Sequence, residues 1–356
     1  MAHDEPDFAA AIAPIDPARS VFAVDGYYVW CGTPIAAPDG DGYRLFYARW
    51  PHGAVGRNAA DRGLFDGFSG WMKHSEIAVA RADDPAGPYR HLRTIVSGTG
   101  DTTRWDAFSG HNPHVRRFGD RYYLYFIATN PQNTPGEWLA KQDSPWLEYH
   151  AGQRVGVVVA DSLDQLVAGE GEVSAQPIMA PDYERTFQMA VNPSVTQMPS
   201  GEYLMAYKAW DAEGAYITVM ATAPTPVGPF QHLGVALQDE LQAEDPYLWF
   251  DAERERYFAI VKDFYPGEDR SRTLTPQFGA LALVESADGL DWTPAAHPIV
   301  SLRALRTNAG ETVPLTRLER PQLLFDDGGV PIVLHAAMST ADPEQGSVNV
   351  ALPLRP

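Results

Sequence analysis

The sequence is poor in cysteine, in cationic residues and in long apolar runs, and each shortage excludes a class of protein. Cys31 is the only cysteine, so an internal disulfide and a cysteine-based zinc site are excluded, and its thiol is expected to be a small buried apolar group. Lys and Arg total 27 against 46 Asp and Glu. The net charge of -19, with no run of basic residues, argues against nucleic acid as a partner. No stretch is apolar for long enough to cross a membrane.

Several familiar sequence signals are also missing. Residues 1–19 lack the basic start and apolar centre of a signal peptide, so the chain as given is expected to be cytoplasmic, or secreted or periplasmic if a signal has been removed. Neither a phosphate-binding glycine loop nor a Gly-x-Ser-x-Gly elbow occurs. Nothing in the sequence indicates an oligomeric state.

Glycine, proline and aromatic residues are abundant instead. The chain has 30 Gly and 30 Pro, 45% hydrophobic residues and 11% aromatic residues. This composition is typical of many short strands joined by tight turns around a large core.

A repeated pattern organises these strands. A polar residue, a proline and an extended segment recur, roughly 50 to 80 residues apart, in five places: Gly32–Ile35, His111–Val115, Val191–Val195, Ala243–Leu248 and Glu319–Leu323. A short turn and a second strand follow every copy, as in Arg121–Phe126. The pattern predicts an all-β, five-bladed β-propeller with about four antiparallel strands in each blade. Residues 1–356 then form one domain, residues 1–19 an irregular extension, and Val21–Val24 the strand that closes the ring.

The lengths of the connections predict a functional face. Long connections span residues 51–74, 99–110, 130–153, 264–277 and 303–318, and in such blades they lie at the end where the proline segments begin. The residues before each proline should therefore surround the mouth of a central channel: Thr33, Asn112, Asn192, Asp245 and Arg320. Preceding residues and the ends of second strands add His111, Glu244, Glu319, Trp50, Lys208, Lys262, Asp263 and His335.

Paired carboxyl groups in such a channel suit glycoside hydrolysis, which needs one protonated and one ionised group. Asp245 and Glu319 are the leading catalytic candidates, with Glu244 or Asp106 assisting. Arg320 is expected to keep its neighbour Glu319 ionised. The alternative is that these carboxylates only cap turns and pair with Arg320 or Lys262.

Tryptophans near the predicted face could stack on sugar rings, although packing beneath long loops explains them equally well. They are residues 50, 71, 105, 138, 146 and 210, of which Trp50 and Trp105 are taken as substrate-binding. His111 and His114 lack a third metal ligand at a recognisable spacing, so hydrogen bonding is favoured for both. No cofactor is expected to be required, although an acidic funnel can hold a structural calcium ion.

With these residues in place, the chain resembles the five-bladed propeller glycoside hydrolases around glycoside hydrolase family 43. The resemblance rests on the proline strand starts, on tyrosine-rich second strands such as Asp120–Tyr125, and on the Asp-Pro-x-Gly-Pro turn at Asp84–Pro88. It implies a carbohydrate substrate, polysaccharide degradation and commonly inversion by an Asp base, a second Asp and a Glu acid. Thr33 and Asn112 stand where that family has aspartates, and no glutamate lies beside Asn192.

Three functions follow. The first is a glycosidase whose carboxylates have moved to the fourth and fifth blades. The second is a glycoside phosphorylase, in which Arg320, Lys208, Lys262 and His111 hold phosphate. The third is a non-catalytic propeller that binds glycan or protein.

Overall fold

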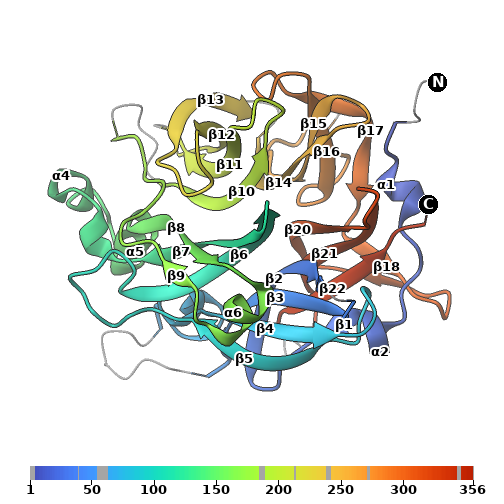
Figure 1. Ribbon diagram of the computed structural model, residues 1–356, viewed down its shortest axis with the longest axis horizontal. Helices are drawn as coiled ribbons and strands as arrows, with labels where there is room; N and C mark the ends of the chain where they lie inside the picture. Colours follow the sequence, from blue (N-terminus) through green and yellow to red (C-terminus); the bar gives the residue numbers. More distant parts are fainter. Residues whose placement is uncertain are drawn as a thin grey trace.

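Five four-stranded antiparallel sheets surround a central axis in the computed structural model (Figure 1), which confirms the five-bladed β-propeller. The structure describes residues 5–38, 40–53, 63–183, 189–211, 214–237, 242–270, 273–342 and 346–355. The innermost strands contact one another around the axis, and the apolar core lies between adjacent blades.

Consecutive strands form the first four blades, counted from the axis outward. The first blade contains β2 (Tyr27–Ala36), β3 (Tyr43–Pro51), β4 (Glu76–Ala82) and β5 (Arg90–Val96). The second contains β6 (Phe108–Phe118), β7 (Arg121–Thr129), β8 (Gln153–Ala160) and β9 (Glu172–Val173). The third contains β10 (Val191–Gln197), β11 (Tyr203–Trp210), β12 (Tyr216–Ala223) and β13 (Gln231–Leu237). The fourth contains β14 (Ala243–Asp251), β15 (Arg256–Asp263), β16 (Leu281–Ser286) and β17 (Thr293–Ser301).

Both ends of the chain build the fifth blade. Its inner strands are β20 (Arg317–Phe325), β21 (Pro331–Ser339) and β22 (Val348–Pro353), and its outer strand is β1 (Val21–Phe22). Val21 pairs with Val350, so the predicted N-terminal strand closes the ring. Closure of this kind protects strand edges that would otherwise be exposed.

Short helices occupy the connections. Residues 5–19, expected to be irregular, contain α1 (Phe8–Ala11) and most of α2 (Pro17–Ser20), and Phe8 packs edge-on against Trp249 with ring centroids 6.2 Å apart. The long connections contain η1 (Gly67–Gly70), α3 (Trp71–His74), η2 (Pro131–Asn133), α4 (Gly136–Leu139) and α5 (Pro145–Ala151), and a hairpin of β18 (Ala304–Arg306) and β19 (Thr312–Pro314). A further helix, α6 (Leu163–Ala168), lies between β8 and β9.

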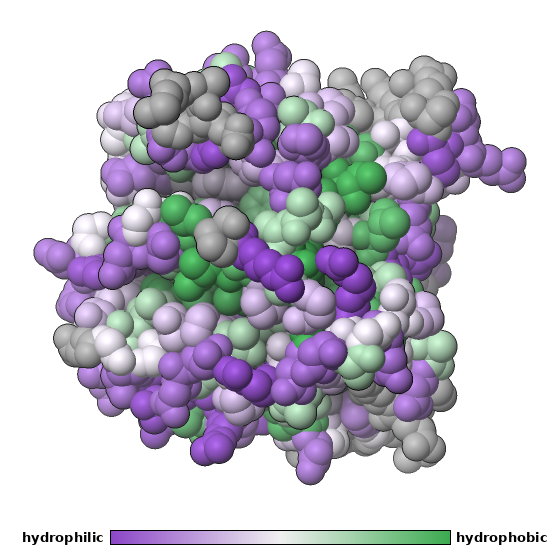
Figure 2. Space-filling view, turned by 90° about the vertical axis from the view of Figure 1, so that its right-hand side faces the viewer, coloured by the Kyte–Doolittle hydropathy of each residue, from purple (hydrophilic) through white to green (hydrophobic). Residues whose placement is uncertain are grey.

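The surface beside the two termini is mainly hydrophilic, with apolar side chains near its middle (Figure 2). In the described part of the chain, no helix has the length and apolar character that a membrane crossing requires.

Each innermost strand is interrupted at an equivalent position by a residue with positive φ, and β6 has a second such residue, Ser109, near its start. The equivalent residues are Cys31 (48°), Asn112 (48°), Asn192 (57°), Asp245 (61°) and Arg320 (55°), and the pairing register shifts at each of them. Cys31 is therefore the equivalent of Asn112 in the first blade, and the assignment of Thr33 to this position was wrong. In the other four blades a proline directly follows the left-handed residue, but in the first blade Gly32 occupies that position. Pro34 lies two residues further on, so aligning it with the other prolines shifted the first blade by two residues. Packing explains why glycine stands at position 32, since a Cβ there would lie 2.6 Å from the side chain of Asn349.

Two residues after each of the first four interruptions, a side chain joins its blade to the next. Backbone N–H groups of the next blade donate to Thr33 Oγ1 at 3.2 Å, His114 Nε2 at 3.1 Å and Ser194 Oγ at 2.8 Å. Tyr247 OH instead donates to a backbone oxygen at 3.1 Å. Thr33 is thus part of a seam between blades.

The seam changes where the fifth blade meets the first, because Pro34 has no N–H to donate. Gln322 reaches His114 instead, with Oε1 3.0 Å from Nδ1. Burial lowers the pKa of His114 to about 3, so the ring is neutral and its Nδ1–H donates to Gln322. This pair joins the second and fifth blades beneath the ring of left-handed residues.

Candidate active site

A cavity of about 450 Å³ lies at the end of the axis where the inner strands begin, and residues of all five blades line it. The predicted site residues that line it are Glu244, Asp245, Glu319, His111, Asn112, Asn192, Arg320, Trp50, Lys208 and Lys262. The long connections supply much of the remaining wall, including Phe68, Trp71 and Trp146.

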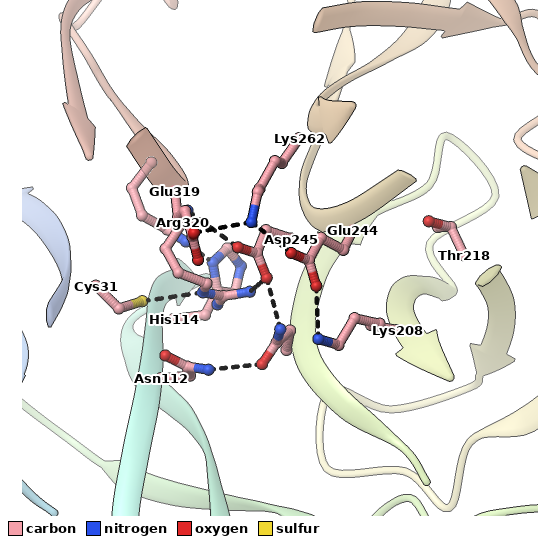
Figure 3. Close-up of polar contacts among 12 residues, drawn as sticks. Cys31, Asn112, His114, Lys208, Thr218, Glu244, Asp245, Lys262, Glu319 and Arg320 are labelled. Atoms are coloured by element: carbon pink, nitrogen blue, oxygen red, sulfur yellow. Dashed lines mark hydrogen bonds and ion pairs between the residues drawn. The ribbon is translucent and has the colours of Figure 1, made fainter. Parts of the chain in front are cut away.

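Hydrogen bonds link the left-handed residues into a floor (Figure 3). Asn112 Nδ2 donates to Asn192 Oδ1, and Asn192 Nδ2 donates to Asp245 Oδ1, both at 2.6 Å. The backbone N–H of Arg320 donates to Asp245 Oδ2 at 3.2 Å, and Arg320 Nε donates to Cys31 Sγ at 3.3 Å. Cys31, expected to be only an apolar filler, is therefore an acceptor in this floor.

Backbone strain accompanies the floor. Asn and Asp adopt left-handed conformations more readily than other non-glycine residues, which suits three of the five positions. Cys31 and Arg320 lack that preference, and such residues cost about 1–3 kcal/mol each. Strain of this kind concentrates at functional sites.

Alternating charges form a chain along one side of the cavity. Lys208 Nζ lies 2.7 Å from Glu244 Oε2, and Lys262 Nζ lies 2.7 Å from Glu244 Oε1. The same Lys262 ammonium lies 2.8 Å from Glu319 Oε1. Both oxygens of Glu244 are thus bound, whereas Glu319 is the most exposed of the three carboxylates, with 16% of its side chain accessible.

This arrangement gives Glu244 and Glu319 opposite pKa shifts. Burial favours the neutral form of Glu244, but the ammonium groups of Lys208 and Lys262 outweigh it and hold its pKa at about 2. Burial raises the pKa of Glu319, and the single contact with Lys262 does not reverse the shift. The cavity therefore contains one glutamate whose pKa is lowered beside one whose pKa is raised.

The expectation that Arg320 keeps Glu319 ionised was wrong. Adjacent residues of a strand point to opposite sides. The Arg320 side chain consequently points to Cys31 and Asp245, and Glu319 meets Lys262.

Aromatic rings form the upper walls. Trp30, Trp50, Phe68 and Trp71 line one part and Trp146, Tyr216, Phe264 and Phe278 another. Trp71 stacks on His111 with centroids 4.6 Å apart, and Ser75 Oγ bonds to His111 Nδ1 at 2.8 Å. Burial holds the pKa of His111 well below its ordinary value, so the imidazole is neutral.

Four predicted site residues lie outside this cavity lining. Asp106 accepts two bonds from Arg104 at 2.8 Å, and Trp105 donates to the backbone of Ser174. Asp263 is buried and binds Arg270 and Thr275. His335 packs against Tyr89 and Asn349. Each has a structural partner of its own.

The three cavity carboxylates are the groups nearest to a site for the calcium ion that the sequence left open. One oxygen each from Glu244, Asp245 and Glu319 lies within 4.8 Å of the others. The ammonium nitrogen of Lys262 already lies between the two glutamates, where a shared cation would bind. A metal ion would have to displace that buried ammonium group.

Several lining residues were missed from the sequence, among them Trp30, His150, Gln153 and Arg317. Trp30 directly precedes Cys31, as His111, Glu244 and Glu319 precede their left-handed residues. The correct register of the first blade would therefore have identified it. His150, Gln153 and Arg317 belong to irregular connections or their edges, which carry no repeat signal.

Comparison with known proteins establishes the fold and nothing finer. No family model and no curated protein matches the sequence. A solved structure described only as a glycoside hydrolase is 12% identical, with a TM-score of 0.63 over 98% of this chain and 94% of its own. Zg3597, a family 117 glycoside hydrolase of the marine bacterium Zobellia galactanivorans, is 15% identical, with a TM-score of 0.59 over 96% and 89%. An alpha-L-arabinofuranosidase from Lactobacillus brevis is 14% identical, with a TM-score of 0.55 over 98% and 94%.

Proposed function

We propose that this protein is a glycoside hydrolase that acts in the aromatic-walled cavity, with Glu319 as the general acid and Asp245 as the nucleophile. The observation that carries the proposal is the electrostatic contrast among neighbouring carboxylates. Glu319, whose pKa is raised, lies beside Glu244, whose pKa is lowered, and beside Asp245, which accepts bonds from Asn192 and Arg320. Catalytic carboxyl pairs require such a division between a protonated and an ionised group.

The separation of the carboxylates favours retention of configuration. Retaining enzymes hold their carboxyl groups about 5–5.5 Å apart, whereas inverting enzymes need about 6.5–9.5 Å to admit a water molecule. Oxygens of Asp245 and Glu319 lie within 4.8 Å of each other. This spacing departs from the inversion that the family resemblance implies.

The reaction would then proceed in two displacements. Glu319 transfers its proton to the glycosidic oxygen, and an Asp245 oxygen bonds to the anomeric carbon as the leaving group departs. Water next attacks that carbon, gives its proton to Glu319, and releases Asp245 as a carboxylate. Glu244 does not react: its negative charge helps to raise the pKa of Glu319.

The walls and the structural comparisons support a sugar substrate. Aromatic faces such as those of Trp71 and Trp146 can stack on the apolar faces of sugar rings. Solved structures that share the fold include proteins described as glycoside hydrolases. A phosphorylase is less well supported, because Glu244 binds both lysines that would hold phosphate.

The test compares two variants on two kinds of substrate. The wild-type protein is first screened on a glycan panel and on aryl glycosides. Asp245→Asn should lose activity on both kinds, because no nucleophile remains. Glu319→Gln should lose activity on glycans. On aryl glycosides, whose leaving groups need little protonation, it should keep much of kcat/KM while kcat falls, because the water of the second step no longer has a base.

Proton NMR of the first product formed should show the configuration of the substrate. Inversion would refute the assigned mechanism while leaving a hydrolase. Binding of glycans by the folded wild-type protein without any sugar release would refute the hydrolase itself. Release that depends on added phosphate and yields a sugar 1-phosphate would identify a phosphorylase.

A further inference from the structure

The floor of the cavity contains buried polar groups that the proposed reaction does not use. Only 1% of the Arg320 side chain is exposed, and neither Nη1 nor Nη2 has a hydrogen-bond partner among the described residues. Asn112 Oδ1 likewise has no donor in the described structure. Leaving such groups unpaired costs about 1–3 kcal/mol each, and more for a charged group. Groups of this kind at a cavity floor point to a ligand that satisfies them.

The geometry of a guanidinium limits the chemistry of that ligand. Nη1 and Nη2 form one edge of a planar fork, which matches the two oxygens of a carboxylate. Arg320 Nε already donates to Cys31, which fixes the plane of the fork. Asp245 does not satisfy this edge, because its nearer oxygen lies 3.7 Å from Nη1 and accepts from Asn192.

The charges around the cavity also favour an anion. Its described lining contains four cationic side chains, Lys208, Lys262, Arg317 and Arg320, against three carboxylates. Burial raises the pKa of one of these carboxylates, Glu319, and the nearby Lys262 does not reverse the shift. The cavity therefore has an excess of positive charge in a chain whose net charge is -19. A concentration of the opposite sign attracts an anionic ligand.

We propose that the sugar unit bound at this floor is a uronic acid, whose carboxylate is held by Nη1 and Nη2 of Arg320. The inference rests on the proposed function, because it names the substrate class of the same cavity. In a hexuronic acid the anomeric carbon and the carbon that bears the carboxylate are both bonded to the ring oxygen. A sugar whose anomeric carbon meets Asp245 can therefore place its carboxylate near the neighbouring Arg320. Asn112 Oδ1 is then available to accept from a ring hydroxyl.

Binding of matched sugar pairs tests this inference. Calorimetric titration of the intact wild-type protein would compare methyl glucuronide with methyl glucoside, and methyl galacturonide with methyl galactoside. We expect the acidic member of at least one pair to bind ten times more tightly or better. Equal or tighter binding of the neutral member in both pairs would overturn the proposal.

Variants separate a specific contact from general attraction. Arg320→Gln should abolish the preference for the acidic sugar, and Arg320→Lys should retain only part of it. Arg317→Gln is the matched control, because Arg317 lies on the same strand and contacts the Phe68 ring at 4.1 Å. An equal loss of preference in Arg317→Gln would overturn the role of Arg320. If Arg320→Gln does not fold, the binding of the matched sugar pairs by the wild-type protein and by Arg320→Lys still tests the inference.

Two further outcomes separate this inference from its premise. If inorganic phosphate alone binds as tightly as the best uronide and competes with it, the anion need not belong to the sugar and the inference fails. Because binding is measured without turnover, tight uronide binding with no hydrolysis would refute the glycosidase and leave this inference standing. Hydrolysis of neutral glycosides alone would support the glycosidase and refute the uronic acid inference.

Discussion

Lys262 Nζ lies 2.8 Å from Glu319 Oε1 and is bound at the same time by Glu244. This ammonium group is the one cation that the described structure places against the proposed acid. Burial alone would lower the pKa of Lys262, but the two glutamates raise it, so the lysine stays charged. The pair thus limits how far the pKa of Glu319 can rise.

Replacing Lys262 by Met should move the alkaline limb of the activity profile to higher pH. The proposed acid works only when protonated, so activity falls as pH rises through the pKa of Glu319. Loss of the ammonium group removes a contact that lowers this pKa. The measurement is kcat/KM against pH, and a limb that stays in place or moves to lower pH would contradict the assignment.

The matched control for that experiment is Lys208→Met. Lys208 bonds to Glu244 and has no contact with Glu319 among the described interactions, so the alkaline limb should move less. Both variants break a buried ion pair, which typically costs about 3–5 kcal/mol of stability. Unfolding curves at each pH are therefore needed to confirm that the protein is folded.

Glu244 predicts a pH-dependent stability. Its pKa in the folded protein is about 2, below the ordinary value of 4.5, so its ionisation stabilises the fold above about pH 4.5. This contribution, of the order of 3 kcal/mol, should be lost as pH falls from about 4.5 towards 2. Glu244→Gln should therefore be less stable than wild type at pH 7, and the difference should shrink towards pH 2. Glu172→Gln, at an exposed position, provides the control; a difference that does not depend on pH would contradict the assignment.

The sequence was sufficient to predict the blades because their signals are local. Proline or glycine follows the left-handed residue of each innermost strand, aromatic and aliphatic residues fill the second strands, and the strand Val21–Phe22 closes the ring as expected. The register of the first blade has no such local signal in the sequence. It depends on the left-handed backbone of Cys31, and cysteine, unlike Asn or Asp, gives no sequence signal for that conformation.

The site was predicted as a set of residues but not as a set of contacts. Asp245 and Arg320 were placed at one mouth by the repeat, and the structure brings them together across 75 positions of sequence. Which of Glu319 and Arg320 points toward Lys262 depends on the strand register. The burial that raises the pKa of Glu319 comes from loops and neighbouring blades, which one strand's sequence does not describe.

The thiol of Cys31 should be unreactive in the folded protein. It is fully buried and lies between Arg320 Nε and the backbone oxygen of Pro113, and burial raises its pKa despite the nearby guanidinium. Because only the thiolate reacts rapidly, a disulfide reagent should label it at a rate that follows unfolding. The check is labelling with and without urea. Rapid labelling of the native protein would show that the floor of the cavity is open to solvent.

Trp146 should contribute to substrate binding without supporting the fold. It lines the cavity, is half-buried, and stacks on His150 with centroids 5.0 Å apart, so His150 fixes the ring as a platform. Aromatic contacts of this kind are worth about 0.5–1.5 kcal/mol, so Trp146→Ala should raise KM up to about tenfold while kcat changes little. Trp138→Ala is the matched control, because Trp138 lies in the same connection but packs against Tyr183 and Lys141 outside the cavity lining. Steady-state kinetics decide between them, and an equal rise of KM in both variants would mean that the whole connection, and not this ring, shapes the site.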